Sequence, residues 1–508
     1  MPFPEAAEAP RRPPLRIGVV ASECAPFAKT GGLADVSAAL ARALVRRGHD
    51  VRVFLPNYRS LSDAGHVGRP GLSPWTLEFP GGPVTVSTRK LALPDAFNTA
   101  GDALEIDLVD APSMFDREGL YGSDDDEPMR WASFNRAVLE ICQREAWSPD
   151  VLHVNDWHTG LLPLILRAGY RWDHLLANTR TLLSIHNLGY QGTFGADALD
   201  VLGLGSVRDQ FHQERLANGQ VNFLETGILH ADWLSTVSRT YADEIQTEVQ
   251  GFGLDGLLRQ RADHLVGIVN GVDYGEWSPD VDPHIPAHFD PSDLAGKRVC
   301  RDALLDEFNL APNPAGPVLG MVSRFTGQKG FELLPEVLQP LLQQHDVRLC
   351  VLGSGDESLE GYFQRLRDSF PDKVGVFFGY KNPLSHRIEA GSDLFLMPSR
   401  YEPCGLNQLY SMRYGTIPLV RATGGLSDTV ERYDPERQTG TGFVFYDYQS
   451  AALAGALGHA LEVWEDQKAW SGLRLRGMRV DASWTRRVRE YEDLYGLVMA
   501  EIGPTGSL

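Results

Sequence analysis

Several loops in this sequence combine positive charge with glycine in a way that suits an anionic ligand. The segment Ala28-Lys-Thr-Gly-Gly-Leu-Ala-Asp-Val36 places Lys29 beside two glycines, Gly31 and Gly32, just before a helical pattern. Glycine lets the backbone approach a ligand closely, and the N–H groups at a helix start favour phosphate. We expect these three residues to contact a phosphate or pyrophosphate. A plain strand–helix turn with a surface lysine is the alternative.

A second basic loop lies in the other half of the chain. Ser323-Arg-Phe-Thr-Gly-Gln-Lys-Gly330 carries Arg324 and Lys329. Two cations there could stabilise a departing diphosphate, a role that otherwise needs a divalent metal. A basic surface loop is the alternative. Gly353 opens a further tight loop, Gly-Ser-Gly-Asp, which presents backbone amides or is only a turn.

A carboxylate lies in the densest of these segments, Pro398-Ser-Arg-Tyr-Glu-Pro-Cys-Gly-Leu-Asn-Gln408. Glu402 lies between a strand end and a helix that begins near Gly405. It could accept hydrogen bonds from sugar hydroxyls and stabilise an oxocarbenium ion, or it could only cap the helix. The next helix opens with Thr423, Gly424 and Gly425, whose amides we expect at the same ligand.

Acidic, aromatic and imidazole side chains follow two strands of the first half. The sequence Val-Asn-Asp-Trp-His-Thr-Gly contains Asp156 and His158, and Ser-Ile-His-Asn contains His186 and Asn187. Such groups are typical of sugar pockets, although a buried, hydrogen-bonded histidine is the commoner role of any single one. The spacings match no HExxH or related metal pattern, so we predict no metal site.

The elements that must position these residues alternate between apolar strands and amphipathic helices. This alternation predicts an α/β fold of two doubly wound, Rossmann-like domains, in which ligands bind at the carboxyl ends of the strands. The expected divisions are a disordered tail at 1–14, a first domain at 15–270, a linker region at 271–316, a second domain at 317–482 and a C-terminal helix within 483–508.

Composition excludes several classes of protein. The net charge of −20 disfavours nucleic acid and anionic membranes as partners. Five cysteines without a CxxC pair suit a reducing compartment. The N-terminus has no apolar stretch typical of a signal peptide, and no apolar run approaches bilayer length. We therefore expect a soluble, cytoplasmic protein. The acidic residues 124–127 are expected in a solvated loop.

Taken together, the motifs resemble those of bacterial glycogen synthases and plant starch synthases. The resemblance runs from about Leu15 to Leu497 and includes KTGGLADV, NDWHTGLLP, IHNLGYQG, GFGLDGLL, SRFTGQKG, EPCGLNQLYSMRYGT and TGGLSDTV. It implies a GT-B fold with the donor held in an interdomain cleft. It also implies transfer of glucose from ADP-glucose to the non-reducing end of an α-1,4-glucan such as glycogen. The anomeric configuration would be retained, without a metal or pyridoxal phosphate as cofactor.

The resemblance also assigns roles to single residues. Lys29 would meet the donor, Asp35 would reach its glucosyl group, and His158 would lie near the reacting glucose. Arg324 and Lys329 would stabilise the diphosphate, and Tyr380 would pack on the adenine. Glu402 would support the glucose, with Cys404 and Gly405 as its neighbours. The last helix, 483–497, would cross back to the first domain.

Three positions depart from the family pattern. Asn407 replaces a threonine of several bacterial members, Tyr410 occupies the place of a second glutamate in many retaining GT-B enzymes, and Glu225 stands where lysine is expected. Glu225 could alter the charge near the cleft.

Other readings of the sequence stay open. One is a glucan-active GT-B enzyme with a different donor base or a phosphorylated-sugar acceptor, and another is a silent glycan-binding protein. Front-side attack and double displacement both remain possible mechanisms, and a homo-oligomer is possible.

Overall fold

The computed structural model of the chain describes residues 13–93 and 104–500. The chain divides into two compact units. Unit 1 comprises Met1–Val237, Ala242–Gly271 and Trp484–Leu508, and unit 2 comprises Ser238–Tyr241 and Val272–Ser483. Most of the tail expected at 1–14 lies outside the described residues. No helix in the described ranges is both long and apolar enough to cross a bilayer.

Unit 1 is built on a largely parallel sheet in the order β12-β11-β8-β7-β1-β2-β6-β5-β3, with β4 paired to β5. The strands from β12 to β6 run parallel, and β5 joins them antiparallel. The sheet strands are β1 (Arg16–Val20), β2 (Asp50–Pro56), β3 (Arg69–Pro70), β4 (Trp75–Leu77), β5 (Val84–Ala92), β6 (Glu105–Asp110), β7 (Val151–Asn155), β8 (Arg180–Ile185), β11 (Trp233–Thr236) and β12 (Leu265–Gly267). A separate hairpin pairs β9 (Thr193–Gly195) with β10 (Gln220–Asn222).

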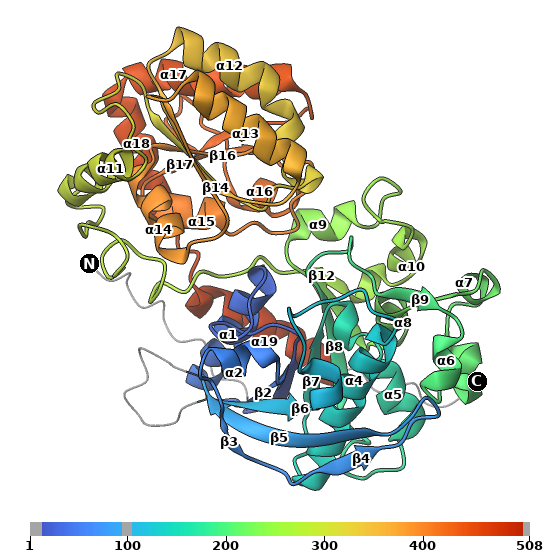
Figure 1. Cartoon of the computed structure of the whole chain (residues 1–508). Coiled ribbons are helices and arrows are strands. Elements are labelled where there is room, and N and C mark those ends of the chain that lie inside the picture. The colour runs from blue at the N-terminus through green and yellow to red at the C-terminus, as the bar shows by residue number, and fades with distance from the viewer. Residues whose placement is uncertain (1–12, 94–103, 501–508) are drawn as a thin grey trace. The chain divides into compact units, whose positions relative to one another are not determined.

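Helices cover this sheet (Figure 1). They are α1 (Gly32–Arg46), α2 (Arg59–Asp63), α3 (Pro112–Phe115), α4 (Glu127–Arg144), α5 (Leu162–Gly169), α6 (Ala198–Val201), α7 (Gln213–Ala217), α8 (Phe223–His230), α10 (Asp255–Gln260) and α19 (Trp484–Ala500), while α9 (Arg239–Glu244) spans a boundary between the units. The apolar residues of α1 recur at helical spacing, and its buried set includes Leu33, Val36, Leu40 and Leu44.

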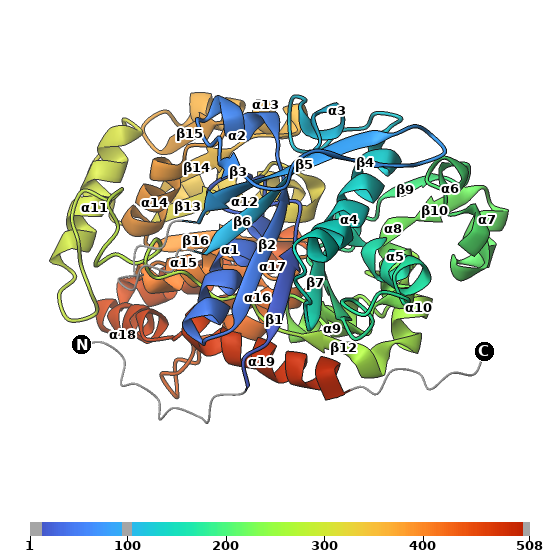
Figure 2. The same cartoon turned by 90° about the horizontal axis from the view of Figure 1, so that it is seen from below.

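Helix α19 belongs to unit 1 although it follows unit 2 in the sequence. Figure 2 shows it in red beside elements of unit 1. The Tyr495 hydroxyl lies 2.9 Å from His153 Nδ1 of β7. Glu492 accepts a hydrogen bond from Arg47 Nε at 3.0 Å and lies 3.1 Å from His49 Nε2. Both contacts are largely buried, so the helix is an integral part of this unit.

Unit 2 holds a parallel sheet in the order β15-β14-β13-β16-β17-β18. The strands are β13 (Val318–Val322), β14 (Arg348–Gly353), β15 (Val374–Phe378), β16 (Leu394–Met397), β17 (Ile417–Arg421) and β18 (Phe443–Phe445). The helices are α11 (Ala295–Glu307), α12 (Pro335–Gln344), α13 (Glu357–Ser369), α14 (Asn382–Gly391), α15 (Asn407–Arg413), α16 (Gly424–Thr429), α17 (Ser450–Glu465) and α18 (Gln467–Met478).

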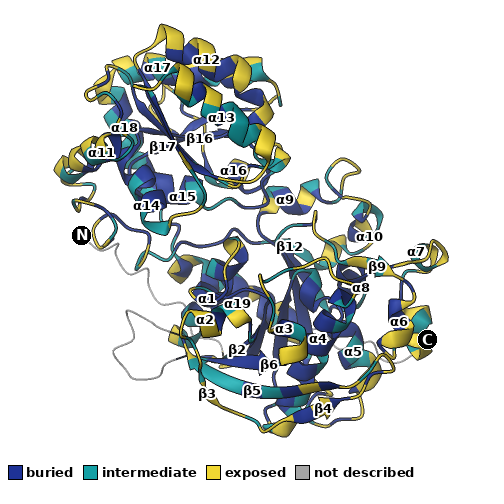
Figure 3. Ribbon diagram, viewed as in Figure 1, coloured by how far each residue is buried: buried dark blue, intermediate teal, exposed yellow. Residues whose placement is uncertain are grey.

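Both faces of the unit 2 sheet are buried. Along β14, Leu349 and Val351 belong to one hydrophobic cluster, whereas Cys350 and Leu352 belong to another. Successive side chains of a strand point to opposite faces, so each cluster fills the space under one layer of helices. Figure 3 shows the central strands of both sheets as buried. The uninterrupted apolar strands of the sequence therefore correspond to a sheet that is covered on both sides.

The linker expected at 271–316 is instead largely part of unit 2, and this corrects the predicted division. It contains α11, which packs on α14. The Trp277 ring lies buried between His386, at 3.7 Å between ring centroids, and Tyr410, at 3.9 Å. The prolines, glycines and aspartates of the segment suggested a connector. Several of its apolar residues, Trp277 and Phe289 among them, anchor it to a hydrophobic cluster.

Candidate functional site

The predicted site residues lie at the carboxyl ends of neighbouring strands in each unit. In unit 1 they follow β1, β7 and β8, which are adjacent in the sheet. In unit 2 they follow β13, β14, β15, β16 and β17, again a continuous set of neighbours. In the sheet of unit 1, β1 lies between β2, the next strand in the sequence, and β7, a much later one. In the sheet of unit 2, β13 likewise lies between β14 and β16. Such a switch point is where doubly wound sheets bind ligands.

The loop after β1 is held together by ion pairing and by a carboxylate that the sequence analysis missed. Lys29 Nζ lies 2.7 Å from Asp35 Oδ1. Glu23, at the start of the loop, accepts hydrogen bonds from the backbone N–H of Thr30 at 2.6 Å and of Gly31 at 3.0 Å. The N–H of Gly31 was expected to face a ligand and is satisfied within the protein instead. A carboxylate three residues beyond a strand that precedes a glycine loop is the signal that could have identified Glu23.

Tyr121 connects this loop to His158. Its hydroxyl donates to Glu23 Oε1 at 2.6 Å and lies 3.0 Å from Ser22 Oγ. Its ring stacks on the His158 ring with 4.7 Å between centroids. Burial and the neighbouring Glu23 charge raise the pKa of Tyr121, so the phenol stays protonated and remains a donor to Glu23.

His158 is enclosed by aromatic rings. Trp157 stacks on it at 4.0 Å between centroids, and Trp131 meets it edge-on at 4.4 Å. Its Nδ1 lies 3.3 Å from Ser22 Oγ, and burial holds the pKa of His158 well below its usual value. The imidazole is therefore neutral and 6% exposed. Its place beside the reacting glucose stays a prediction, and its ring contacts also hold it firmly against Trp131, Trp157 and Tyr121.

Asp156 and His186 are more accessible than His158, and they lie together. The backbone N–H of His186 donates to Asp156 Oδ1 at 2.7 Å, and the ring nitrogen His186 Nε2 lies 2.8 Å from Asn155 Oδ1. Burial raises the pKa of Asp156 to about 7, although hydrogen bonds from the backbone N–H groups of His186 and Asn187 partly lower it. Burial lowers the pKa of His186 to about 4. Asn187 Oδ1 accepts from the Gly189 N–H at 3.0 Å.

The backbone of Asp156 adopts a conformation that is rare outside glycine, with φ of 58° and ψ of −175°. Such a conformation costs on the order of 1–3 kcal/mol and persists where surrounding structure imposes it. Strained backbone together with a pKa near neutrality is typical of a functional carboxylate. Asp156 is therefore the residue of unit 1 with the strongest structural signs of a functional role.

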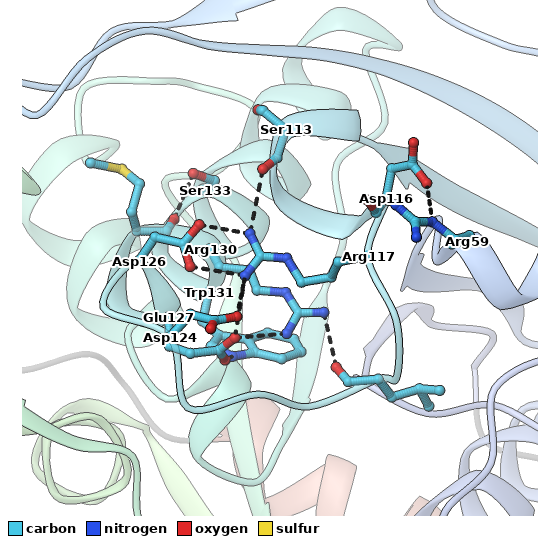
Figure 4. A network of polar contacts seen from close by, with 12 residues as sticks. Arg59, Ser113, Asp116, Arg117, Asp124, Asp126, Glu127, Arg130, Trp131 and Ser133 are labelled. Atoms are coloured by element: carbon cyan, nitrogen blue, oxygen red, sulfur yellow. Dashed lines mark hydrogen bonds and ion pairs between the residues drawn. The ribbon is translucent and has the colours of Figure 1, made fainter.

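The acidic residues that precede α4 form an ion-pair network with Arg117 (Figure 4). The guanidinium donates to Asp126 at 2.6 and 2.9 Å and to Asp124 at 3.2 Å, and it lies 3.8 Å from Glu127. The three carboxylates are close enough to hold a cation, with ligand oxygens within 4.8 Å of one another. Arg117 already supplies positive charge to them.

Glu127 was expected in a solvated loop and is buried instead. It accepts hydrogen bonds from Arg130 at 2.9 Å and from Trp131 Nε1 at 2.8 Å. Because Trp131 packs on His158, the network fixes one of the rings that surround that histidine. The sequence of four consecutive acidic residues does not indicate that Glu127 is buried. The negative charge of Glu127 is compensated by arginines, and the local sequence pattern does not show this.

In unit 2, Lys329 and Glu402 form an ion pair across the switch point. Lys329 Nζ donates to Glu402 Oε2 at 2.7 Å and to Oε1 at 3.0 Å. Ser399 Oγ donates to Glu402 Oε2 at 2.9 Å. Glu402 is buried, and Arg324 is exposed in the loop that carries Lys329. The structure therefore brings together the cationic loop after β13 and the carboxylate after β16, which are 73 residues apart in the sequence.

The glycines that open α16 pack against the loop of Glu402. Gly424 has φ of +44°, and a Cβ there would lie 2.0 Å from the Glu402 carbonyl oxygen. The Gly425 N–H donates to the carbonyls of Glu402 and Pro403, both at 3.1 Å. A Cβ on Gly353 would likewise lie 1.9 Å from the Ser323 carbonyl oxygen. These glycines let the loops approach one another, and the contact of their amides with a ligand stays a prediction.

The remaining predicted residues of unit 2 lie around the same strand ends. Tyr380 follows β15, is 65% exposed, and donates to Asn382 Oδ1 at 2.8 Å. Cys404 and Thr423 are buried, and Gly405 adopts a positive φ of 70° before α15. The exposed ring of Tyr380 is available as a flat surface for a planar ligand group.

The three departures from the family pattern are accommodated locally. Tyr410 stacks on Trp277, and Asn407 Nδ2 donates to the Val322 carbonyl at 2.8 Å. Glu225 is buried and pairs with Arg215 Nε at 2.7 Å. The charge of Glu225 is thus compensated within unit 1, which removes the expected change in charge near the cleft.

Comparisons with known proteins agree with this arrangement. The model of the starch synthase catalytic domain matches residues 16–260, and that of glycosyl transferases group 1 matches residues 305–472. Glycogen synthase 1 of Geobacter metallireducens is 42% identical over 487 residues, covering 95% of this chain and 96% of the relative. Glycogen synthase of Anaeromyxobacter dehalogenans is 45% identical over 489 residues, covering 95% and 99%.

Solved structures give the same result. The catalytic domain of starch synthase IV from Arabidopsis thaliana, bound to ADP and acarbose, has a TM-score of 0.86 and 32% identity, covering 96% of this chain and all of that chain. A sucrose-phosphate synthase from Thermosynechococcus elongatus shares the fold, with a TM-score of 0.59 and 17% identity over 96% of this chain and 99% of that one. Both units have the parallel, doubly wound sheets of the GT-B glycosyltransferase fold. The chain belongs to the glycogen and starch synthase family of glycosyltransferases.

Proposed function

We propose that this enzyme transfers glucose from ADP-glucose to the non-reducing 4-hydroxyl of an α-1,4-glucan with retention of the anomeric configuration. The observation that carries the proposal is the Lys329–Glu402 ion pair at the switch point of unit 2, with Arg324 in the same loop. A diphosphate leaving group and a glucosyl group need a cation and a carboxylate side by side. The ADP in the related starch synthase structure supports the choice of nucleotide.

The role of Lys329 would change when the donor binds. In the free protein its Nζ contacts both oxygens of Glu402. We propose that Lys329 and Arg324 stabilise the negative charge that develops on the diphosphate as the bond from C1 to the leaving oxygen breaks. Glu402 would then accept hydrogen bonds from glucose hydroxyls and stabilise the positive charge at C1. Before the donor binds, the hydrogen bond from Ser399 would keep the Glu402 carboxylate oriented toward Lys329.

The acceptor step needs no strong base from the protein. The 4-hydroxyl oxygen of the glucan would bond to C1 on the face from which the diphosphate departs, and a phosphate oxygen would take its proton. We propose that Asp156 and His186 contact sugar hydroxyls, because both are more accessible than His158 and lie within one hydrogen-bonded group. His158 would then position Tyr121 and the loop after β1.

The proposed donor is tested by offering ADP-glucose and UDP-glucose separately with glycogen as primer. We expect nucleotide release to depend on the primer and kcat/KM to be on the order of tenfold higher for ADP-glucose. The exposed ring of Tyr380, which we propose packs on the adenine, gives a physical reason for a base preference. Equal or greater activity with UDP-glucose would contradict the proposed donor. Absence of glucan extension with either donor would contradict the proposed reaction.

We further propose that catalysis requires no metal. Arg324 and Lys329 supply the positive charge that a divalent ion provides in other enzymes that release a diphosphate. Turnover is therefore expected to change less than about twofold when EDTA is present and no divalent ion is added. The measurement is the initial rate with EDTA alone, with excess Mg²⁺ restored as the control. Loss of activity with EDTA and its recovery with Mg²⁺ would refute this part of the proposal.

The proposed compartment is the cytoplasm. All five cysteines are buried thiols, which suits a reducing environment. Burial raises the pKa of Cys24 to about 12 and also raises the pKa of Cys350, so these thiols are poorly reactive. The proposed partners are ADP-glucose and a glucan chain, and the net charge of −20 disfavours nucleic acid.

A further inference from the structure

A cationic pocket lies in unit 2, between the first two turns of α11 and the second half of α18. It has a volume of about 330 Å³. Four basic side chains line it together with two acidic ones and the start of α11, namely Lys297, Arg298, Arg301, Arg474, Asp293, Asp393 and the backbone of 292–295. Positive charge therefore exceeds negative charge in a protein whose net charge is −20.

The pocket is separate from the site proposed for the donor. Asp393 immediately precedes β16, and the Gly316 carbonyl, which accepts from Arg301, precedes β13. These are the amino ends of the strands, whereas Lys329 and Glu402 follow their carboxyl ends. A parallel strand of four or five residues separates the two edges by roughly 15 Å.

Asp393 fixes two of the guanidinium groups in place. Its Oδ2 accepts from Arg301 Nε at 2.9 Å, and its Oδ1 accepts from Arg474 Nη2 at 3.1 Å. The same carboxylate accepts from the Val318 N–H at 3.0 Å and is buried. One carboxylate thus orients two arginines but neutralises only one of them. Such preorganisation lowers the entropic cost of binding an anion.

Arg301 and Arg474 have N–H donors that these contacts do not use. A guanidinium has more N–H groups than these contacts use, and Arg474 Nε is buried without a hydrogen-bond acceptor among the described residues. Arg298 is exposed at the rim and adds a further positive charge.

Lys297 adds to the positive charge of the pocket. It is buried, and its Nζ donates to the carbonyls of Ala390 at 3.0 Å and Tyr414 at 2.8 Å and to Thr416 Oγ1 at 2.9 Å. Burial, followed by the charge of Arg474, lowers the pKa of Lys297 to about 7. A dianion in the pocket would offset the repulsion between Lys297 and Arg474.

We propose that this pocket binds a small phosphomonoester, separately from the nucleotide-sugar site. Oriented arginines match the oxygens of a phosphate group better than a single lysine would, because each can donate two parallel hydrogen bonds. The volume exceeds that of inorganic phosphate and lies at the lower end of ligand pockets, so the organic part of the ligand is small. The excess of positive charge disfavours a metal cation here.

The test uses glycerol phosphate as the probe and titration calorimetry on the full-length protein. Glycerol phosphate is expected to bind with a dissociation constant in the millimolar range or below, inorganic phosphate to compete with it, and glycerol to give no signal. Arg298→Gln is expected to weaken binding about tenfold through loss of a charge-assisted contact. Asp293→Asn keeps an oxygen for the Ala295 N–H that Asp293 now caps, and removes a repulsive charge. It is expected to tighten binding about two- to threefold.

Two control variants separate this pocket from other sites. Lys329→Ala removes a cation of the proposed donor site, and Arg437→Gln removes an exposed arginine elsewhere in unit 2. Neither is expected to change the affinity for glycerol phosphate by more than about twofold. Absence of binding to the unmodified protein, loss of binding in Lys329→Ala, or unchanged affinity in Arg298→Gln would each overturn the proposal. Because the readout is binding, it is independent of the proposed glucosyl transfer.

Discussion

Replacing Glu402 by glutamine is expected to lower turnover by at least about a hundredfold while the protein remains folded. Glutamine has nearly the same shape and can still accept from Ser399, but it cannot match the charge of Lys329 or stabilise positive charge at C1. Loss of one such electrostatic contact in an enclosed site costs on the order of 10²–10³ in kcat. The measurement is the initial rate of ADP release from ADP-glucose with glycogen present.

Ser399→Ala is the matched control for this prediction. It removes one hydrogen bond to Glu402 Oε2 but leaves the carboxylate and Lys329 in place. A hydrogen bond to an ionised carboxylate is worth about 1.5–3 kcal/mol, but Lys329 still holds both oxygens of Glu402, so a loss at the lower end of that range, about tenfold, is expected. Circular dichroism and thermal unfolding establish that both variants are folded. Turnover of the Glu402→Gln variant within about threefold of the unmodified enzyme would leave Glu402 with only a structural role.

Asp156→Asn is expected to lower kcat/KM by roughly 10- to 100-fold, as loss of a charged hydrogen-bond acceptor costs about 1.5–3 kcal/mol. It is also expected to change the pH dependence. The pKa of Asp156 is raised to about 7 by burial, so the carboxylate forms as the pH rises through 7. If the ionised form contacts sugar hydroxyls, kcat/KM of the unmodified enzyme falls about tenfold for each pH unit below 7.

The asparagine variant makes this prediction specific. Asparagine has nearly the same shape as aspartate and can still accept the backbone N–H of His186, so the local structure is expected to be retained. Its kcat/KM should be low and nearly independent of pH between about 5 and 7. The pKa of His186 is lowered to about 4 by burial, and burial also holds the pKa of His158 well below its usual value, so these imidazoles do not titrate in the range. An acidic limb that persists in Asp156→Asn, or activity that rises as the pH falls below 7, would contradict the assignment.

The architecture was predictable because it follows from short-range patterns. Runs such as 318–322 and 394–397 contain only apolar residues and glycine, and they alternate with amphipathic helices. The family motifs added the GT-B fold, which the structural relatives confirm. The segment 271–316 was misassigned because its composition resembles a linker. Its packing depends on partners such as Tyr410, which lies more than a hundred residues further along the chain.

The pairing within the site could not be predicted from the same patterns. The motifs identified Lys329 and Glu402 separately, but only the order of the strands brings their loops together. Glu23 was missed because a carboxylate after a strand has no distinctive local context, and its role depends on the fold of the loop seven residues later. Gly424 and Gly425 were read as ligand-binding amides. Their close approach to the Glu402 loop depends on distances between backbones that are far apart in sequence.

The position of α19 has a consequence for how the protein is made. The first part of unit 1 is translated before unit 2, yet the helix that covers His153 and pairs with Arg47 and His49 is translated after unit 2. At roughly 5–20 residues per second, the translation of unit 2 leaves that surface uncovered for about 10–50 s. Unit 2 has all its strands before α19 exists. The second half of the chain can therefore complete its fold before the first, and a nascent chain stalled in this interval is a natural client for chaperones.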